Sequence, residues 1–214
     1  MHIDLFGVVL FMHITVVIVA FAMAGVMHTA LQATARAGTV QELRAWGKAM
    51  HRIEPLFPVM ALLLLGFGIW LVHLGEHTDD AFRFSDGWII TAIVTLVAVE
   101  AMGGAILAPR GKKLTELIEH SPDGPVSDEI HARTIDPMVW YAAHVTTFAF
   151  LGVVFLMAAK PTGAWAWLFP AVGAVIGAAL SRWQLGAIAQ TDGSVPAQRR
   201  PVDAAAQPET AQAG

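Results

Sequence analysis

Five long stretches of this chain carry almost no charge, and their length constrains the fold more than any other feature. The first runs from Leu5 to Ala35 without a single Lys, Arg, Asp or Glu. At about 1.5 Å per residue, each stretch is long enough as a helix to cross a hydrocarbon core of roughly 30 Å. The sequence therefore predicts an all-α integral membrane bundle of five transmembrane helices. We expect these spans at about 5–30, 54–75, 87–108, 137–159 and 163–183.

The overall composition agrees with a membrane protein and excludes several kinds of chemistry. Hydrophobic residues make up 56% of the 214 residues and charged residues only 14%, whereas soluble domains carry about 25% charged residues. The net charge of −4 does not suggest a nucleic-acid partner. The chain has no cysteine, which excludes disulfides, thiolate metal sites, iron–sulfur clusters and thiol catalysis.

The charges of the segments between the spans predict an orientation. Basic residues are frequent after the first, third and fifth spans and rare after the second and fourth. Cytoplasmic loops of membrane proteins carry an excess of Lys and Arg. We therefore expect a multi-pass membrane protein with its N-terminus outside and its C-terminus in the cytoplasm. The basic residues of the first and third segments are Arg36, Arg44, Lys48, Arg52, Arg110, Lys112, Lys113 and Arg133.

Residues 1–190 are expected to form one bundle, whose largest soluble piece is the loop 109–136. Within this loop, Lys112–His120 is typical of a short amphipathic helix, and Ser127 is a candidate cap for a second one running to Ile135. From Thr191 onward the chain is rich in Ala, Pro and Gln, without an apolar period. This composition predicts a disordered cytoplasmic tail over 191–214.

Several stretches resemble a bacterial inner-membrane family catalogued only as a domain of unknown function. They are His51-Arg52-Ile53-Glu54-Pro55, the run Ala61–Gly66, and the ending Leu156-Met157-Ala158-Ala159-Lys160-Pro161 of the fourth span. The similarity covers roughly residues 5 to 162, and the Leu-Met-x-x-Lys-Pro ending is its most specific part. The resemblance implies a four-span helical bundle and no particular activity. The fifth span and the tail lie beyond the usual end of the family.

Ionisable residues inside the spans are the first candidates for a functional site, because they are costly in lipid and usually face the bundle interior. Four of them fall in the predicted cytoplasmic half: His28, Glu54, Glu100 and His144. We expect a buried His/Glu cluster there, with a hydrogen bond from Glu100 to His144 or His28. Such a cluster can equally be a structural clamp that holds the helices together.

Haem binding is the main alternative for the histidines. His13 and His28 lie on similar faces of the first span, about 22 Å apart along its axis. His144 is then a partner for His28 in the inner leaflet, and His73 a partner for His13 in the outer leaflet. Paired imidazoles in a helical bundle are suitable axial ligands for haem b, so this interpretation predicts an electron-transfer subunit.

Copper handling and proton conduction are further alternatives. Met12 beside His13, and Met23 and Met27 near His28, supply soft ligands suited to Cu(I), although Met is also a common apolar filler. The Glu and His residues of the cytoplasmic half could relay protons partway across the membrane.

Enzymatic signatures are absent from the sequence. It contains no phosphate-binding glycine loop, no nucleophile elbow and no His-Glu-x-x-His zinc motif. In the fifth span, Gly173 and Gly177 form a small-residue face that predicts a helix contact, either inside the bundle or with a second copy or another membrane subunit. We therefore expect a non-enzymatic membrane protein whose partners are the lipid bilayer and other membrane-embedded chains.

Overall fold

The computed structural model describes residues 4–75 and 82–194, and the regular structure in these residues is helical. The elements follow one another along the chain and are joined by short connections. In order they are α1 (Leu5–Ala35), α2 (Val40–Ile53), α3 (Leu56–Gly75), α4 (Gly87–Met102), the π-helical turn η1 (Gly103–Leu107), α5 (Ala108–His120), α6 (Asp128–Thr134), α7 (Pro137–Ala159) and α8 (Trp165–Ser194).

Five helical segments of the described chain are long and apolar enough to cross a membrane, as the sequence predicts. Two of them extend further than expected. α1 continues to Ala35 rather than ending near residue 30. α8 continues to Ser194 rather than ending near residue 183, and Pro196 is the first proline after Trp183. α8 thus includes the first four residues of the predicted tail 191–214, and the rest of that tail lies outside the described residues.

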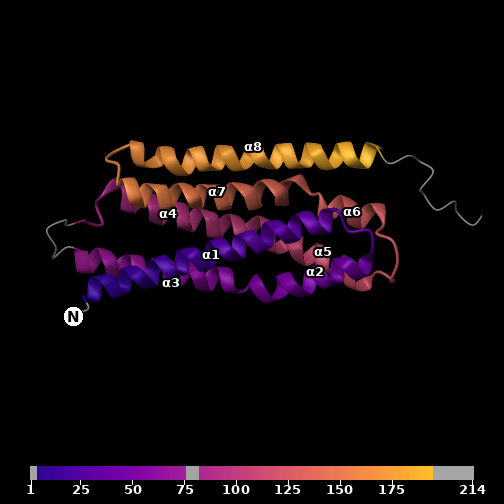
Figure 1. The fold of residues 1–214 in the computed structure, drawn as a ribbon, viewed down its shortest axis with the longest axis horizontal. Helices are drawn as coiled ribbons and strands as arrows, with labels where there is room; N and C mark the ends of the chain where they lie inside the picture. The colour runs from indigo at the N-terminus through magenta and orange to yellow at the C-terminus, as the bar shows by residue number, and fades with distance from the viewer. Residues whose placement is uncertain (1–3, 76–81, 195–214) are drawn as a thin grey trace, which may run out of the picture.

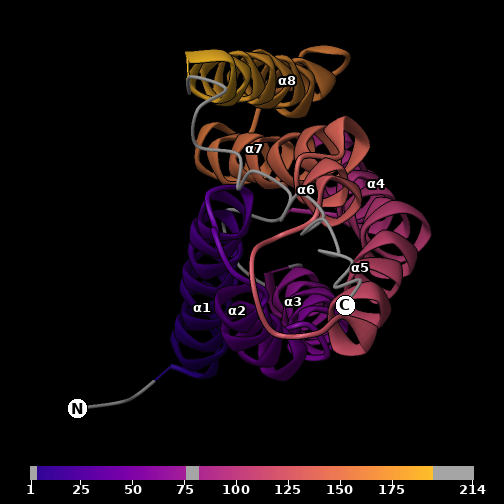
Figure 2. The same cartoon turned by 90° about the vertical axis from the view of Figure 1, so that its right-hand side faces the viewer.

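The long helices lie side by side, with α8 on the outside of the bundle and α3 on the opposite side (Figure 1). α7 is the central helix, because it packs against α8, α4 and α1. The end-on view shows α8 stacked mainly on α7, while α1, α3 and α4 lie on the other side of α7 (Figure 2). α8 also makes a smaller contact with α4. α1 pairs with α3, whereas α3 and α4 touch over a short length only. The bundle is therefore loosely closed between α3 and α4.

Small residues bring α7 and α8 into backbone contact. A Cβ atom on Gly173 would collide with the carbonyl of Phe148, and one on Gly177 would collide with the carbonyl of His144. Gly152 on α7 lies in the same way against the carbonyl of Phe169. The small-residue face predicted from Gly173 and Gly177 thus packs inside the bundle, where close approach maximises van der Waals contact between helices.

A π-helical turn joins α4 to α5 and keeps 87–120 continuous as one long helix. The N–H of Ala108 donates to the carbonyl of Gly103, five residues earlier. Pro109 explains this turn, because a proline inside a helix has no N–H to donate and its ring clashes with the carbonyl four residues before it. A local widening of the helix relieves this clash without ending the helix.

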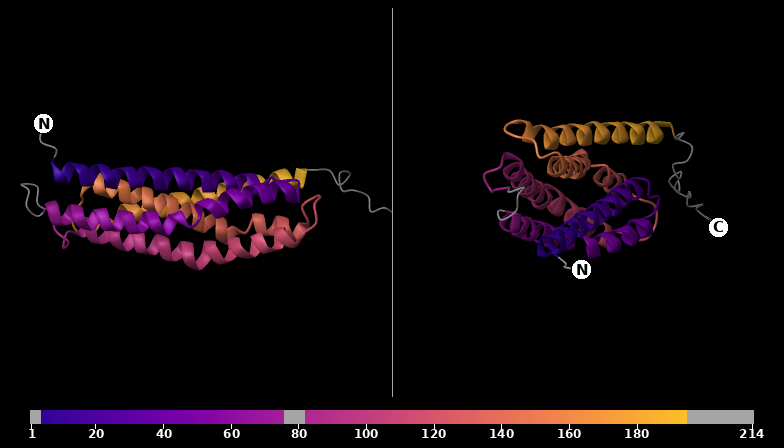
Figure 3. Two further views of the ribbon diagram at one scale, coloured as in Figure 1. Left: turned by 90° about the horizontal axis from the view of Figure 1, so that it is seen from below. Right: turned by 60° about the vertical axis from the view of Figure 1, so that its left-hand side comes forward.

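The helices α2, α5 and α6 lie together at one end of the bundle (Figure 1 and Figure 3). We call residues 37–48 and 112–134 the helical cap. Its own small core lies between α2, α5 and α6 and consists of the buried side chains Val40, Leu43, Ile118 and Ile130. The two predicted short helices are both present, and the Ser127 side chain accepts a hydrogen bond from the N–H of Ile130, which confirms the predicted cap.

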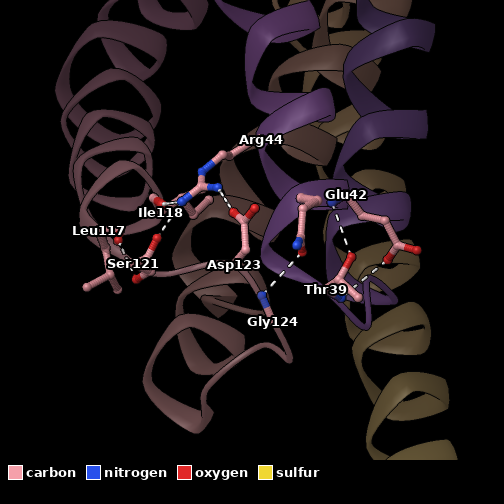
Figure 4. Close-up of polar contacts among 9 residues, drawn as sticks. Thr39, Glu42, Arg44, Leu117, Ile118, Ser121, Asp123 and Gly124 are labelled. Carbon is pink, nitrogen blue, oxygen red and sulfur yellow. Dashed lines mark hydrogen bonds and ion pairs between the residues drawn. The ribbon is translucent and has the colours of Figure 1, made fainter.

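Arg44 joins α2 to the loop that follows α5 (Figure 4). Its guanidinium bonds the carboxylate of Asp123 and the carbonyl of Ser121, and it lies 3.4 Å from the carbonyl oxygen of Ile118. Beside it, the N–H of Val40 donates to the carbonyl of Gly124 at 2.9 Å. A planar guanidinium presents several donors in fixed directions, so this one side chain holds the loop 121–124 against α2.

Candidate functional site

The sequence-predicted histidines His28 and His144 are in contact between α1 and α7. Their ring centroids are 4.4 Å apart, with 56° between the ring planes. His144 is 2% exposed and is stacked on the fully buried ring of Trp140, with 12° between the planes. The pair is therefore a compact aromatic cluster that joins the central helix to α1.

Hydrogen bonds on the pair determine which nitrogen of each neutral ring carries the proton. The hydroxyl of Thr147 donates to the carbonyl of Ala143 at 2.9 Å, so its oxygen is left to accept from Nε2–H of His28 at 3.0 Å. Nδ1–H of His144 donates to the carbonyl of Trp140 at 2.8 Å. Because a carbonyl only accepts, both tautomers follow from these partners. Nδ1 of His28 is buried and has no hydrogen-bond partner in the part of the chain that the structure describes.

The two glutamates of the predicted cluster do not join the histidines. Glu54 is exposed at the junction between α2 and α3. Glu100 is partly buried on α4, and among the described residues it has no hydrogen bond or ion pair with His144 or His28. The two imidazoles bond Thr147 and the Trp140 carbonyl. Among the described residues, the contact that joins members of the predicted cluster is therefore the histidine pair.

The observed geometry does not fit haem ligation by these pairs. An iron between two axial imidazoles separates the rings, whereas the rings of His28 and His144 are in direct contact at 4.4 Å between centroids. His73, the predicted outer partner of His13, is exposed near the end of α3 and does not line the space around His13. The structure therefore brings together one of the two predicted pairs, and that pair has no room for iron between its rings.

The described residues show no arrangement of side chains that supports copper binding or proton conduction. Among the described residues there is no group of three or more His, Cys, Asp or Glu side chains that could hold a metal ion. Met12 is exposed, while Met23 is buried. Among the described residues, neither Glu54 nor Glu100 has a hydrogen bond or ion pair with His28 or His144, so direct contacts do not link the four predicted relay groups.

A cavity of about 280 Å³ lies in the other half of the bundle, between α1, α3, α4 and α7. Its lining is almost entirely aliphatic and aromatic, and it forms where α3 and α4 make little contact. We call this space the His13 cavity, because His13 on α1 lies in its wall. The apolar walls include Leu64 on α3, Trp88 on α4 and Phe150 on α7.

The cavity holds two ionisable groups among its described lining residues, His13 and Lys160. His13 is 7% exposed, and its Nδ1 is buried without a hydrogen-bond partner among the described residues. Gly68 faces the same ring, because a Cβ there would lie 3.6 Å from Cε1 of His13. Lys160 is exposed at the end of α7 and also lines the cavity. An apolar cavity with a few polar groups is the usual form of a small-molecule site.

Comparison with known proteins assigns no family: the chain matches no protein-family model, no curated protein and no solved structure.

The His13 cavity was not predicted from the sequence. The sequence marks His13 as an ionisable group inside a span, but its neighbours come from three other helices and from the segment before α4, including Phe82. In the sequence, Lys160 belongs to the Leu-Met-x-x-Lys-Pro ending and carries no sign of a cavity. The available signal was the conjunction of an ionisable residue inside the first span with a Gly-x-Gly pair, Gly66 and Gly68, in the second.

Proposed function

We propose that this protein is a non-enzymatic, multi-pass protein of the bacterial inner membrane that binds a membrane-soluble apolar molecule in the His13 cavity. The observation that carries this proposal is the cavity itself, which lies between four membrane-length helices and is lined by apolar side chains. Dense packing is the rule in protein interiors, so an apolar space of about 280 Å³ between spans is a candidate binding site.

The lining supports binding rather than catalysis. Enzyme sites pair an acid with a base or place a nucleophile beside a base. The described lining of the His13 cavity holds one imidazole and one ammonium group, and no carboxylate or hydroxyl side chain. In this proposal the His28–His144 pair is a clamp between α1 and α7, held by the hydrogen bond to Thr147.

The orientation is part of the proposal. The helical cap holds five Lys and Arg side chains, which by the positive-inside tendency favours the cytoplasmic side. They are Arg44, Lys48, Lys112, Lys113 and Arg133. The His13 cavity then lies in the outer half of the membrane, with the N-terminus outside.

Single cysteines test the orientation, since the natural chain has none. Ser85→Cys lies in the exposed connection before α4, and Glu129→Cys lies on the exposed side of α6. With a membrane-impermeant maleimide on intact spheroplasts, we expect labelling at position 85 and not at 129. Both positions should react after the membrane is opened, and the reverse pattern would show the opposite orientation.

A photoreactive probe tests the cavity. We would incorporate the purified protein into nanodiscs with a neutral long-chain hydrocarbon carrying a diazirine, irradiate it and map the adducts by mass spectrometry. We expect adducts on cavity residues, and Gly68→Leu should reduce them several-fold because its side chain would project toward His13. Gly66→Leu is the matched control, since a Cβ at Gly66 meets open space.

Two results would overturn the cavity proposal. One is labelling confined to exposed lipid-facing side chains such as Leu62 and Val175. The other is equal labelling of the cavity in the Gly68→Leu and Gly66→Leu proteins when both remain folded by circular dichroism.

A further inference from the structure

Lys160 lies where the His13 cavity opens. It is the only cationic Lys or Arg side chain in the described lining, and it is exposed. Its Nζ is 5.2 Å from the ring centroid of Phe82 and 5.9 Å from that of Trp88, and both rings also line the cavity. Cations are attracted to aromatic faces at distances of up to about 6 Å. The two rings thus hold the ammonium group over the opening.

The backbone conformation of Lys160 fixes this residue at the end of α7. Lys160 caps α7 in the left-handed conformation, with φ 44°, and its N–H donates to the carbonyl of Leu156 at 2.8 Å. A left-handed conformation is uncommon for residues other than glycine. Pro161 follows and has no N–H with which to continue the helix. The side chain therefore starts from a defined point at the end of the central helix.

The ammonium group has no anionic partner among the described residues. The ion pairs found there join Arg44 to Asp123, Arg110 to Asp136, and Lys112 to Glu116, none of which lines the cavity. An ammonium group offers three donors. At the opening of an apolar cavity, it is complementary to a ligand that carries a negative charge at one end.

Phe82 connects Lys160 to α1 within the lining of the cavity. The Phe82 ring lies under Nζ of Lys160 and 6.1 Å from the ring of Phe6 on α1, between centroids. His13 follows Phe6 by seven residues of helix, which corresponds to about 10 Å along α1. The lining of the cavity thus runs from the ammonium group of Lys160 past apolar rings to His13.

We infer that the ligand of the His13 cavity is a single-chain amphiphile with its anionic head group at Lys160 and its hydrocarbon chain directed toward His13. This inference rests on the proposed function. One chain suits the size, because about 280 Å³ is at the small end of ligand pockets. The anionic head can be the carboxylate of a fatty acid or the phosphate of a lysophospholipid, since both present oxygens to an ammonium donor.

Competition with the neutral photoreactive probe tests the inference. In nanodiscs of zwitterionic lipid, we would add stearate, stearyl alcohol or lysophosphatidate and measure the loss of cavity labelling. We expect stearate to compete at about fivefold lower mole fraction than stearyl alcohol, which corresponds to an ion pair near a surface. Comparison of stearate with lysophosphatidate distinguishes a carboxylate from a phosphate head.

Variants assign the charge preference to Lys160. Lys160→Gln should make stearate and stearyl alcohol equal competitors, whereas Lys160→Arg should preserve the preference. Arg83→Gln is the control, because it removes an exposed positive charge near the same end without changing the described lining. Equal competition by the acid and the alcohol in the natural protein would overturn the inference while the cavity labelling still supported the proposed function. A loss of preference in Arg83→Gln equal to that in Lys160→Gln would also overturn it.

Discussion

Nε2 of His28 on α1 and Oγ1 of Thr147 on α7 are 3.0 Å apart and form a hydrogen bond between the two helices. The same hydroxyl donates to the carbonyl of Ala143, one turn earlier in α7. The Thr147 oxygen therefore gives α7 a side-chain acceptor, whereas the backbone carbonyls inside a helix already accept from N–H groups of the same helix. In a membrane, this bond joins spans that the hydrophobic effect alone does not hold together.

Removal of this acceptor should destabilise the bundle modestly. Thr147→Val keeps the shape of the side chain and leaves Nε2–H of His28 without its partner. We expect the free energy of unfolding to fall by about 1 kcal/mol, the range measured for single hydrogen bonds between membrane helices. Equilibrium unfolding in mixed micelles measures this change. Thr15→Val is the control, because Thr15 bonds only the carbonyl of Phe11 in its own helix. Equal effects of the two variants would contradict a clamp at Thr147.

Close approach of α7 and α8 should be sensitive to a single methyl group. In Gly173→Ala, the new Cβ would collide with the carbonyl of Phe148, so α8 must move away from α7. We expect a loss of stability of about 1–3 kcal/mol, as for other overpacked interiors. Gly186→Ala on the same helix meets open space. It should be neutral or slightly stabilising, since alanine favours helix over glycine. A neutral Gly173→Ala would show that α8 does not pack as described.

Arg44 should control the mobility of the loop in the helical cap. In Arg44→Gln the bonds to Asp123 and to the carbonyl of Ser121 are lost. We expect hydrogen exchange at the amides of Val40 and Val126, which bond across this loop, to accelerate up to about tenfold. The effect is limited because the Asp123 side chain is 64% exposed.

Arg44→Lys should slow hydrogen exchange at Val40 and Val126 only partly relative to Arg44→Gln, because an ammonium group lacks the planar fork of the guanidinium. Lys48→Gln is the control on the same helix, since Lys48 is exposed and forms no ion pair among the described residues. Exchange rates unchanged in Arg44→Gln would contradict this role of Arg44.

The histidine geometry predicts the optical spectrum of the purified protein. Because the rings of His28 and His144 are in contact, no haem should bind between them. From cells supplied with haem, we expect no stoichiometric b-type band in the dithionite-reduced spectrum. A Soret band that disappears in His144→Ala and persists in Lys48→Gln would contradict this prediction and restore the electron-transfer alternative.

Local features of the fold were predictable because they depend on neighbouring residues. An uncharged run of about 20 residues must form a helix in lipid, since each backbone N–H and C=O needs a partner within the same segment. The start of α6 after Ser127 and the start of α7 at Pro137 follow from capping chemistry in the same way. Gly173 and Gly177 likewise indicated a close helix contact before the partner helix was known.

The sequence by itself determined that this chain forms membrane-length helices, and it singled out His28 and His144 as ionisable groups inside them. Tertiary structure decided that these two rings meet, that Glu100 stays apart from them, and that the partner of the small-residue face is α7. It also decided where α3 and α4 separate to leave the His13 cavity beneath Lys160. The physical reason is that helix formation depends on hydrogen bonds a few residues apart, whereas pairing and cavities depend on how side chains from distant segments pack together.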